Sequence, residues 1–402
     1  GLRRGGFEYY ALDVTNKTSP KLLWNVTYPE MGESWSTPVV TRIDINTAGT
    51  NADDAVVVLG GGYDTIHDTA TYPSTTEDAV GNGIHILDLV SGAELWRAGN
   101  DAGADLQVAG MTRSIPSQVR AVDMTGDGFA DRMYAADLGG QLLRFDIKNG
   151  ETPANLVTGG VIAQLGAEGL AAANFADTRR FYTTPDVSIF SDRNENKRFI
   201  SLSIGSGYRA HPLDESAADR FFSVRDPDVF NQLTQADYNS YDIVTDADLV
   251  EVRGSVRTII DPTDRGWKFT LPANQKVLSD SVTFDDTVTF VGFSPEEAAS
   301  SDGCAPTLGK NFLYRVSVEN GDPVVNNLDT LDPADADDER MEELAQGGIA
   351  PTPTILFPSP DDPDCTGTDC AVPPIGCVGV ECFDPGFANN PVRTLWTQDG
   401  IQ

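Results

Sequence analysis

Basic residues are scarce in this 402-residue chain. Against 61 Asp and Glu there are only 28 Lys and Arg, and the net charge is −33. Because nucleic acids and anionic membrane surfaces are bound through basic patches, this balance excludes a nucleic acid as the partner and favours cations or basic proteins. The chain also lacks any run of about 18 apolar residues, which a membrane-spanning helix requires, so we expect no direct membrane insertion.

Features of catalytic sites are lacking as well. The three histidines, His67, His85 and His211, lie far apart in sequence, and His85 falls inside a strand-like pattern, so we expect it to be packed rather than catalytic. The stretch 204–208 is not a Gly-x-Ser-x-Gly elbow followed by a helix. The glycines at 60–62 lack the Lys-Ser/Thr of a phosphate-binding loop. The sequence therefore predicts a protein that is not an enzyme.

Only five cysteines occur, and their spacing argues against zinc. Cys304 stands alone, and the other four share a Pro/Gly-rich stretch: Cys365, Cys370, Cys377 and Cys382. Zinc ligands are usually two residues apart and often include His. We therefore expect local disulfides among these four and an oxidising compartment, with the connectivity open. Cys304 is expected to be free or paired outside this chain.

The chain is rich in short strand-like runs separated by turns that use its 38 Gly and 24 Pro. Many runs end in Asp and a turn, as in YYALDV, GIHILDL and LLRFDI. Other runs are preceded by Ser/Thr-x-Pro or a similar motif, which we call the lead-in to the strand. After the next strand comes Gly-Gly-Tyr or Gly-Ser-Gly-Tyr. Such regularity is typical of a β-propeller. We predict an all-β, modified β-propeller of roughly six to seven blades, a single domain over 1–402, with 392–398 completing the first blade.

Three stretches interrupt this pattern. We expect an insertion with its own helices over 210–265, an acidic insertion over 326–346 with a short helix at 333–346, and an irregular Cys-rich loop over 359–391. The chain begins with Gly1 and carries no signal-like apolar run. It therefore reads as a fragment of a longer protein, with any export signal upstream.

The most specific signal lies within 117–147, in the stretch DMTGDGFAD. Its spacing wraps a calcium ion, because alternate positions supply oxygen atoms and the Gly at position 6 permits the sharp turn. Position 12, which holds a bidentate Glu in helical loops, is Tyr134 in a strand-like run. The loop should therefore close a β-hairpin. The candidate ligands are the side chains, or at position 7 the carbonyl, of Asp123, Thr125, Asp127, Phe129 and Asp131.

In this set Asp131 would make the bidentate contact, and Thr125 is the weakest donor because a hydroxyl binds calcium less well than a carboxylate. We expect an affinity in the extracellular range, on the order of 10⁻⁴ M or somewhat tighter. The alternative is an Asp/Gly-rich hairpin turn without an ion, since both residue types favour turns.

Several segments, in this order, resemble a known family: YYALDVTNKTSPKLLWNV, VVVLGGGYD, the calcium loop with DRMYAADLGGQLLRFDI, SLSIGSGYR, GWKFTLP and KVLSDSVTFDDTVTFVGFSP. They are similar to the C-terminal domain of the PilY/PilC family of type IV pilus biogenesis factors and tip-associated adhesins. The resemblance covers nearly the whole chain. Asn or Asp is commoner in the family where Thr125 stands, which concerns the affinity of the site.

The resemblance implies a modified β-propeller with one bound Ca²⁺, held by the loop residues named above. It implies a factor that supports pilus extension by opposing retraction and that is needed for twitching motility and surface adhesion. Its partners would be pilus components (minor pilins at the pilus tip), and a surface or host receptor reached through an N-terminal region outside this chain. The expected location is the pilus tip or cell surface, outer membrane or periplasm of a Gram-negative bacterium.

Two other functions remain open. ALDVTNKTSPKLLW and ILDLVSGAELW also resemble blade repeats of quinoprotein dehydrogenases, although the adjacent Cys-Cys pair typical of those enzymes is missing. An integrin-like adhesion module, in which calcium only stiffens a blade, has the same expected fold without a role in pilus assembly. The chain contains no Arg-Gly-Asp tripeptide.

Overall fold

The structure is a computed structural model that describes most of the chain. The described residues are 1, 4–47, 54–68, 77–166, 175–192, 197–253, 260–261, 263–295, 308–324, 340–358 and 372–386. Within them the regular secondary structure is mostly strand, arranged in six sheets. No helix in these ranges is long and apolar enough to cross a membrane.

The first two sheets come from the first quarter of the chain. The N-terminal hairpin pairs β1 (Tyr9–Asp13) with β2 (Lys21–Val26). The second sheet runs in chain order through β3 (Val39–Arg42), β4 (Ala55–Gly60), β5 (Ile84–Asp88), β6 (Glu94–Gly99) and β7 (Leu106–Gln107). A 3₁₀ turn, η1 (Thr65–Asp68), follows β4.

The third and fourth sheets form the middle of the molecule. The third has the order β15 (Val244–Thr245), β11 (Val157–Gln164), β10 (Gln141–Ile147), β9 (Arg132–Ala136) and β8 (Arg120–Val122). The fourth has the order β12 (Asp186–Asp192), β13 (Lys197–Gly205), β14 (Arg220–Asp226), β17 (Gly266–Thr270) and β16 (Val250–Glu251). Short helices flank them: α1 (Pro153–Leu156), η2 (Phe175–Asp177), α2 (Gln235–Asn239) and η3 (Asp246–Asp248).

The fifth and sixth sheets follow. The fifth is built from β18 (Lys276–Val277), β20 (Thr287–Ser294), β21 (Lys310–Ser317) and β22 (Met341–Leu344), with β19 (Val282–Phe284) paired to β20. The small sixth sheet holds β23 (Thr354–Leu356), β24 (Ile375–Val378) and β25 (Glu381–Phe383).

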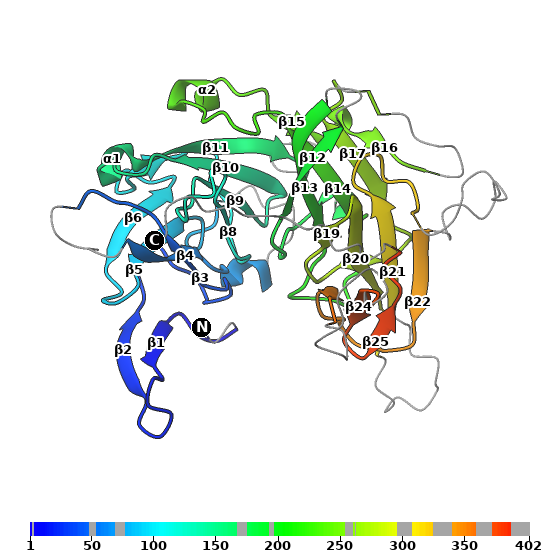
Figure 1. Ribbon diagram of the computed structural model, residues 1–402, viewed down its shortest axis with the longest axis horizontal. Coiled ribbons are helices and arrows are strands. Elements are labelled where there is room, and N and C mark those ends of the chain that lie inside the picture. Colours follow the sequence, from blue (N-terminus) through cyan, green and yellow to red (C-terminus); the bar gives the residue numbers. More distant parts are fainter. Residues whose placement is uncertain are drawn as a thin grey trace, which may run out of the picture.

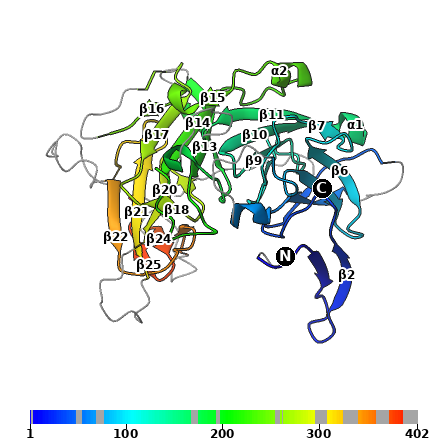
Figure 2. The same cartoon turned by 180° about the vertical axis from the view of Figure 1, so that it is seen from behind.

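The sheets follow one another around an arc. In Figure 1 the arc runs from the blue β1–β2 hairpin, through β10 and β11, to the red β24–β25 hairpin, and Figure 2 shows the same arc from behind. Successive sheets of antiparallel strands in chain order are the arrangement of a propeller. The predicted all-β, propeller-like fold is confirmed, with four blade-sized sheets and two small ones in the described part of the chain.

Apolar layers between neighbouring sheets form the core. Trp96 and Ile86 of the second sheet are fully buried in one cluster with Met133 and Phe145 of the third. Similar clusters lie between the third and fourth sheets and between the fourth and fifth. Strands β9 and β10 are buried along their whole length because they have neighbours on both faces.

A buried network of charges joins the third and fourth sheets. Arg144 of β10 donates from Nη1 to both carboxylate oxygens of Asp226 at the end of β14, at 2.8 and 2.9 Å. Its Nη2 reaches Asp146, which also accepts from Arg132 Nε at 2.7 Å. Tyr134 donates to Asp226 at 2.7 Å. All four charged side chains are at most 2% exposed, so each depends on its partners for solvation.

The range 210–265 is not wholly an insertion. It contains α2 and short 3₁₀ structure, as expected, but its strand β14 lies in the middle of the fourth sheet between β13 and β17. After β14 the chain crosses to the third sheet, where β15 pairs in parallel with β11, and returns to the fourth sheet as β16. The two sheets are therefore interlocked by this crossing segment.

Two further expectations need correction. The helix predicted at 333–346 is wrong where the structure describes it, because β22 pairs with β21; residues 333–339 lie outside the described part. The 359–391 stretch is not irregular throughout, since β24 and β25 add to β23. Cys377 and Cys382 form the expected local disulfide across that hairpin. Cys304, Cys365, Cys370 and the closing strand at 392–398 lie outside the described residues.

Candidate functional site

The predicted loop does close a β-hairpin. Strands β8 and β9 are antiparallel, with Val122 opposite Arg132, and residues 123–131 connect them. Gly126 and Gly128 have φ of 78° and 91°, in the left-handed region that only glycine adopts readily. No heavy atom lies within 4 Å of the position a Cβ would take on either glycine. Glycine is therefore required there by the backbone conformation and not by crowding.

The carboxylate of Asp123 organises the first half of the loop. Its Oδ1 accepts from the backbone N–H groups of Thr125 (3.1 Å) and Gly126 (2.6 Å), and its Oδ2 accepts from Gly128 (2.8 Å). Desolvation opposes the charged form of Asp123, but these N–H groups outweigh it and lower its pKa. Asp123 thus stays ionised well below neutral pH.

The other two acidic residues have different partners. Asp131 Oδ2 accepts from the N–H groups of Met124 (2.8 Å) and Thr125 (3.0 Å), so Asp123 and Asp131 meet at the same turn of backbone. Asp127 accepts only from Phe129 N–H, at 2.9 Å. Asp123 and Asp131 thus share the N–H of Thr125, whereas Asp127 binds a different N–H, and both Asp123 and Asp127 are exposed.

Contacts with two sheets hold the second half of the loop. Arg42, in β3, makes two of these contacts. Its guanidinium lies 4.2 Å from the ring centre of Phe129, and its backbone carbonyl accepts from the N–H of Ala130 at 2.9 Å. Asn149 donates to the Ala130 carbonyl at 3.1 Å, and Ile147 N–H donates to that of Asp131 at 2.8 Å. The end of the loop is fixed while residues 125–128 are exposed.

These donors fit calcium in type, but their positions are not those of a closed cage. Asp127 Oδ2 and Asp131 Oδ1 accept no hydrogen bond from the described residues and retain free lone pairs. Yet across the described ranges no three His, Cys, Asp or Glu side chains gather closely enough to hold a metal ion. Without a cation, the three carboxylates repel one another. Binding would require the loop carboxylates to move closer together.

Two of the three histidines, His67 and His85, occupy packed positions. His85 is fully buried in β5 and contacts Glu94 through Nδ1 at 2.6 Å. His67 Nε2 lies 2.7 Å from Asp78 Oδ2, which also accepts from Ser114 Oγ at 2.6 Å. In a catalytic triad the imidazole contacts the nucleophilic hydroxyl; here the carboxylate lies between them. This buried cluster joins loops and does not activate Ser114.

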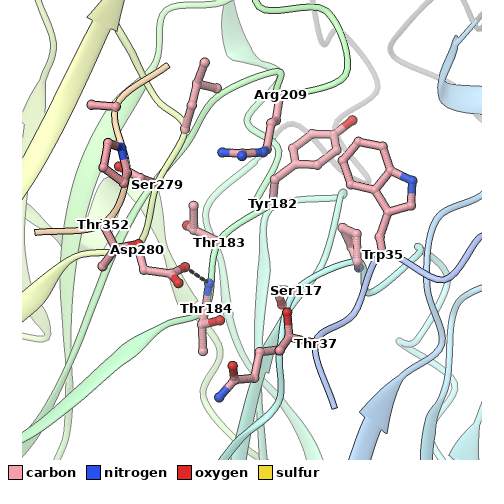
Figure 3. Close-up of a pocket in the computed structure, with 15 residues that line it drawn as sticks. Trp35, Thr37, Ser117, Tyr182, Thr183, Thr184, Arg209, Ser279, Asp280 and Thr352 are labelled. Carbon is pink, nitrogen blue, oxygen red and sulfur yellow. Dashed lines mark hydrogen bonds between the residues drawn. The ribbon is translucent and has the colours of Figure 1, made fainter. Parts of the chain in front are cut away.

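Sequence reasoning missed a pocket of about 270 Å³ near the centre of the arc. It is formed by loop segments from five of the sheets, and Figure 3 shows the side chains around it. The available signal was the recurring Ser/Thr-x-Pro lead-in, since several of these segments carry it. The sequence pattern gives no indication that the lead-ins converge.

Part of the chain is similar in sequence to known type IV pilus proteins. A stretch of 156 residues, 37% of the chain, is 35% identical to the type IV pilus biogenesis factor PilY1 of Pseudomonas aeruginosa. The protein of the same name from strain UCBPP-PA14 is 30% identical over 149 residues, or 36% of the chain. Each match spans 11% of the relative, so the chain corresponds to a small part of these proteins. No family profile matches the chain.

The structural comparison covers far more of the chain. The crystal structure of the Pseudomonas aeruginosa PilY1 C-terminal domain matches 96% of the chain and 80% of its own length, with a TM-score of 0.61. Sequence identity over this match is 19%. This likeness by itself shows the fold, and the more similar 156-residue stretch supplies the sequence relationship.

Proposed function

Because this chain contains a C-terminal domain of the PilY1 family, we propose that it is part of a type IV pilus biogenesis factor that supports pilus extension by opposing retraction. The observation that carries this proposal is the 35% identity to PilY1, joined to a fold match over 96% of the chain. Minor pilins at the pilus tip are the proposed partners. The proposed location is the surface of a Gram-negative cell, where the whole protein supports twitching motility and adhesion.

Deleting the gene in its own host tests the role in pilus assembly. Cells without the protein should have few surface pili, and additional deletion of the retraction motor should restore them. Expression of the full-length protein should restore pili in the single mutant. Unchanged piliation in the deletion strain would refute the proposal, and failure of the motor deletion to restore pili would refute the opposition to retraction.

We further propose that the 123–131 loop binds one calcium ion. Support comes from oxygen donors at ligand spacing, free lone pairs on Asp127 and Asp131, and the contacts that fix the end of the loop. Calcium would supply positive charge that draws the three carboxylates together. An ordered loop would then present the surface that acts in pilus extension.

Calorimetric titration of the purified chain with calcium tests this site. The unaltered chain should bind one ion, and Asp123→Ala should abolish tight binding while the protein still folds, because the loop is exposed. Asp242→Ala is the matched control, since Asp242 is 95% exposed and paired only with Arg265. Equal calcium binding by the unaltered chain and Asp123→Ala would remove the site.

We propose that the domain has no catalytic activity of its own. The order of contacts among Ser114, Asp78 and His67 supports this, because the serine is not adjacent to a base. A quinoprotein role is tested by titration with pyrroloquinoline quinone. A visible-absorbance change on binding, followed by alcohol oxidation, would contradict the proposal.

A further inference from the structure

The central pocket is built from equivalent segments of successive sheets. Residues 35–37 precede β3, 116–118 precede β8, 182–184 precede β12, 278–280 precede β19, and 350–352 precede β23. Each segment is the approach to a strand at or near the start of its sheet. The pocket therefore lies where these approaches converge, and it is distinct from the 123–131 loop, none of whose residues line it.

The lining is dominated by hydroxyl groups. Six of the pocket residues are Ser or Thr: Thr37, Ser117, Thr183, Thr184, Ser279 and Thr352. Several belong to the Ser/Thr-x-Pro lead-ins, as in Thr183-Thr184-Pro185, where the proline sets the extended approach to the strand. The repeated motif thus gathers hydroxyls at one place, although its copies are scattered through the chain.

Three of these residues are largely buried but line the cavity. Thr183, Thr184 and Ser279 are 5%, 4% and 8% exposed. Their hydroxyls make no hydrogen bond to another described residue; only the backbone N–H of Thr184 is engaged, with Asp280 Oδ1 at 2.8 Å. None of these three oxygens is among the fully enclosed polar atoms that lack a partner. The hydroxyls are therefore open to the cavity, where they can donate to and accept from a polar ligand.

The remaining lining narrows the class of ligand. Trp35 and Tyr182, with ring centres 5.7 Å apart, form an aromatic wall, and Figure 3 shows Arg209 reaching across the cavity toward Ser279. An anion would meet Asp280 as well as Arg209, and a metal ion would find one carboxylate. An apolar ligand would displace the water that solvates these hydroxyls without replacing its hydrogen bonds.

A sugar ring meets all of these requirements. It has hydroxyls that both donate and accept around its edge, and C–H faces that pack on aromatic rings. The cavity of about 270 Å³ suits a single ring, since it corresponds to roughly nine waters at ~30 Å³ each. We propose that the central pocket is a carbohydrate-binding site that takes one sugar residue, either a free sugar or the end of a glycan.

Saturation-transfer NMR on the full chain tests this inference with four probes: D-glucose, D-galactose, D-mannose and N-acetyl-D-glucosamine. At least one should receive saturation from the protein and shift the indole signal of Trp35, with a Kd on the order of 1 mM. Methyl glycosides and short oligosaccharides of the positive sugar then distinguish a free sugar from a glycan end. Tighter binding of the oligosaccharide identifies the glycan.

Two variants place the binding in this pocket. Thr183→Val and Ser279→Ala each remove one hydroxyl from the lining of the pocket and should weaken binding by roughly fivefold or more. Thr289→Val is the matched control, because Thr289 is 4% exposed in β20 and does not line the pocket. Calcium titration of each variant should be unchanged, which separates this site from the loop.

Absence of saturation transfer to all four probes would overturn the inference. The same holds if Thr289→Val weakens binding as much as Thr183→Val. If the pocket variants fail to fold, the Trp35 indole signal of the unaltered chain decides whether the sugar binds in this pocket. Sugar binding without a shift of that signal would show that the sugar binds elsewhere and would refute the inference. Binding of a Ser/Thr-rich peptide in place of every sugar also refutes it.

Discussion

Replacing the buried Asp226 should strongly lower the free energy of unfolding of the protein. This carboxylate accepts two hydrogen bonds from Arg144, one from Tyr134 and one from the N–H of Asp228 at 3.1 Å. In Asp226→Ala the Arg144 Nη1 and the Tyr134 hydroxyl lose their acceptor in a site closed to water. Arg144 keeps Asp146 and the carbonyl of Asn231 as partners, which limits the loss.

The size of the effect follows from the burial. Breaking a fully buried ion pair by removing one partner costs about 3–5 kcal/mol, because the remaining charge loses its compensation. The Tyr134 hydroxyl would keep the bond it accepts from Arg132 Nη1 at 3.3 Å, but its O–H would lose its acceptor, and an unsatisfied buried donor of this kind costs about 1–3 kcal/mol. Since Arg144 retains Asp146, we expect a loss of about 4 kcal/mol in the free energy of unfolding, near the middle of the first range.

Urea unfolding followed by tryptophan fluorescence measures this loss. Asp226→Ala should lower the urea midpoint and leave the slope of the transition unchanged, because the surface exposed on unfolding is the same. Asp242→Ala, which breaks an ion pair whose acid is 95% exposed, should leave the midpoint in place. Equal midpoints for these two variants would refute the claim that this network holds the third and fourth sheets together.

Three further results are expected. Burial raises the pKa of Asp219 to about 6 from 3.8, so the folded state holds this proton more tightly than the unfolded state does. About 3 kcal/mol of the free energy of unfolding should therefore be lost as the pH rises from about 4 to 6. Asp219→Asn should flatten this dependence of stability on pH, and an unchanged dependence contradicts the assignment. Asp127→Lys should place an ammonium among the loop carboxylates, so cells keep their pili but respond little to calcium; loss of pili argues against it. Mass spectrometry of the unreduced protein should show Cys377 and Cys382 linked, and two free thiols there would exclude the bridge.

The parts of the fold that sequence predicts are those fixed by local pattern. The hairpin loop follows from the spacing of its acids and glycines, and β10 coincides with the run QLLRFDI. The sequence does not indicate strand β11, because the pair Gly159 and Gly160 favours a turn. In the structure Gly159 pairs with Phe145 of β10, whose ring occupies the space that a Cβ on Gly159 would need, at 2.3 Å. That contact depends on the neighbouring strand and not on local preference.

The same reason explains why the sites were only partly foreseen. The loop residues are contiguous, so the sequence shows that they lie near one another. It does not show that Asp123 and Asp131 share the Thr125 N–H while Asp127 binds that of Phe129. The pocket joins residues as distant as Thr37 and Thr352, and the network pairs Arg144 with Asp226. Such contacts require the order of the sheets around the arc, which a single sequence does not specify.

The central claim links calcium in the loop to pilus extension. It is tested most directly by counting surface pili on cells that carry Asp123→Ala in the full-length protein, with and without the retraction motor. The account predicts few pili with the motor present and normal numbers without it. Normal piliation in Asp123→Ala cells, with calcium binding lost in the same purified protein, would contradict the account and leave the ion a structural role.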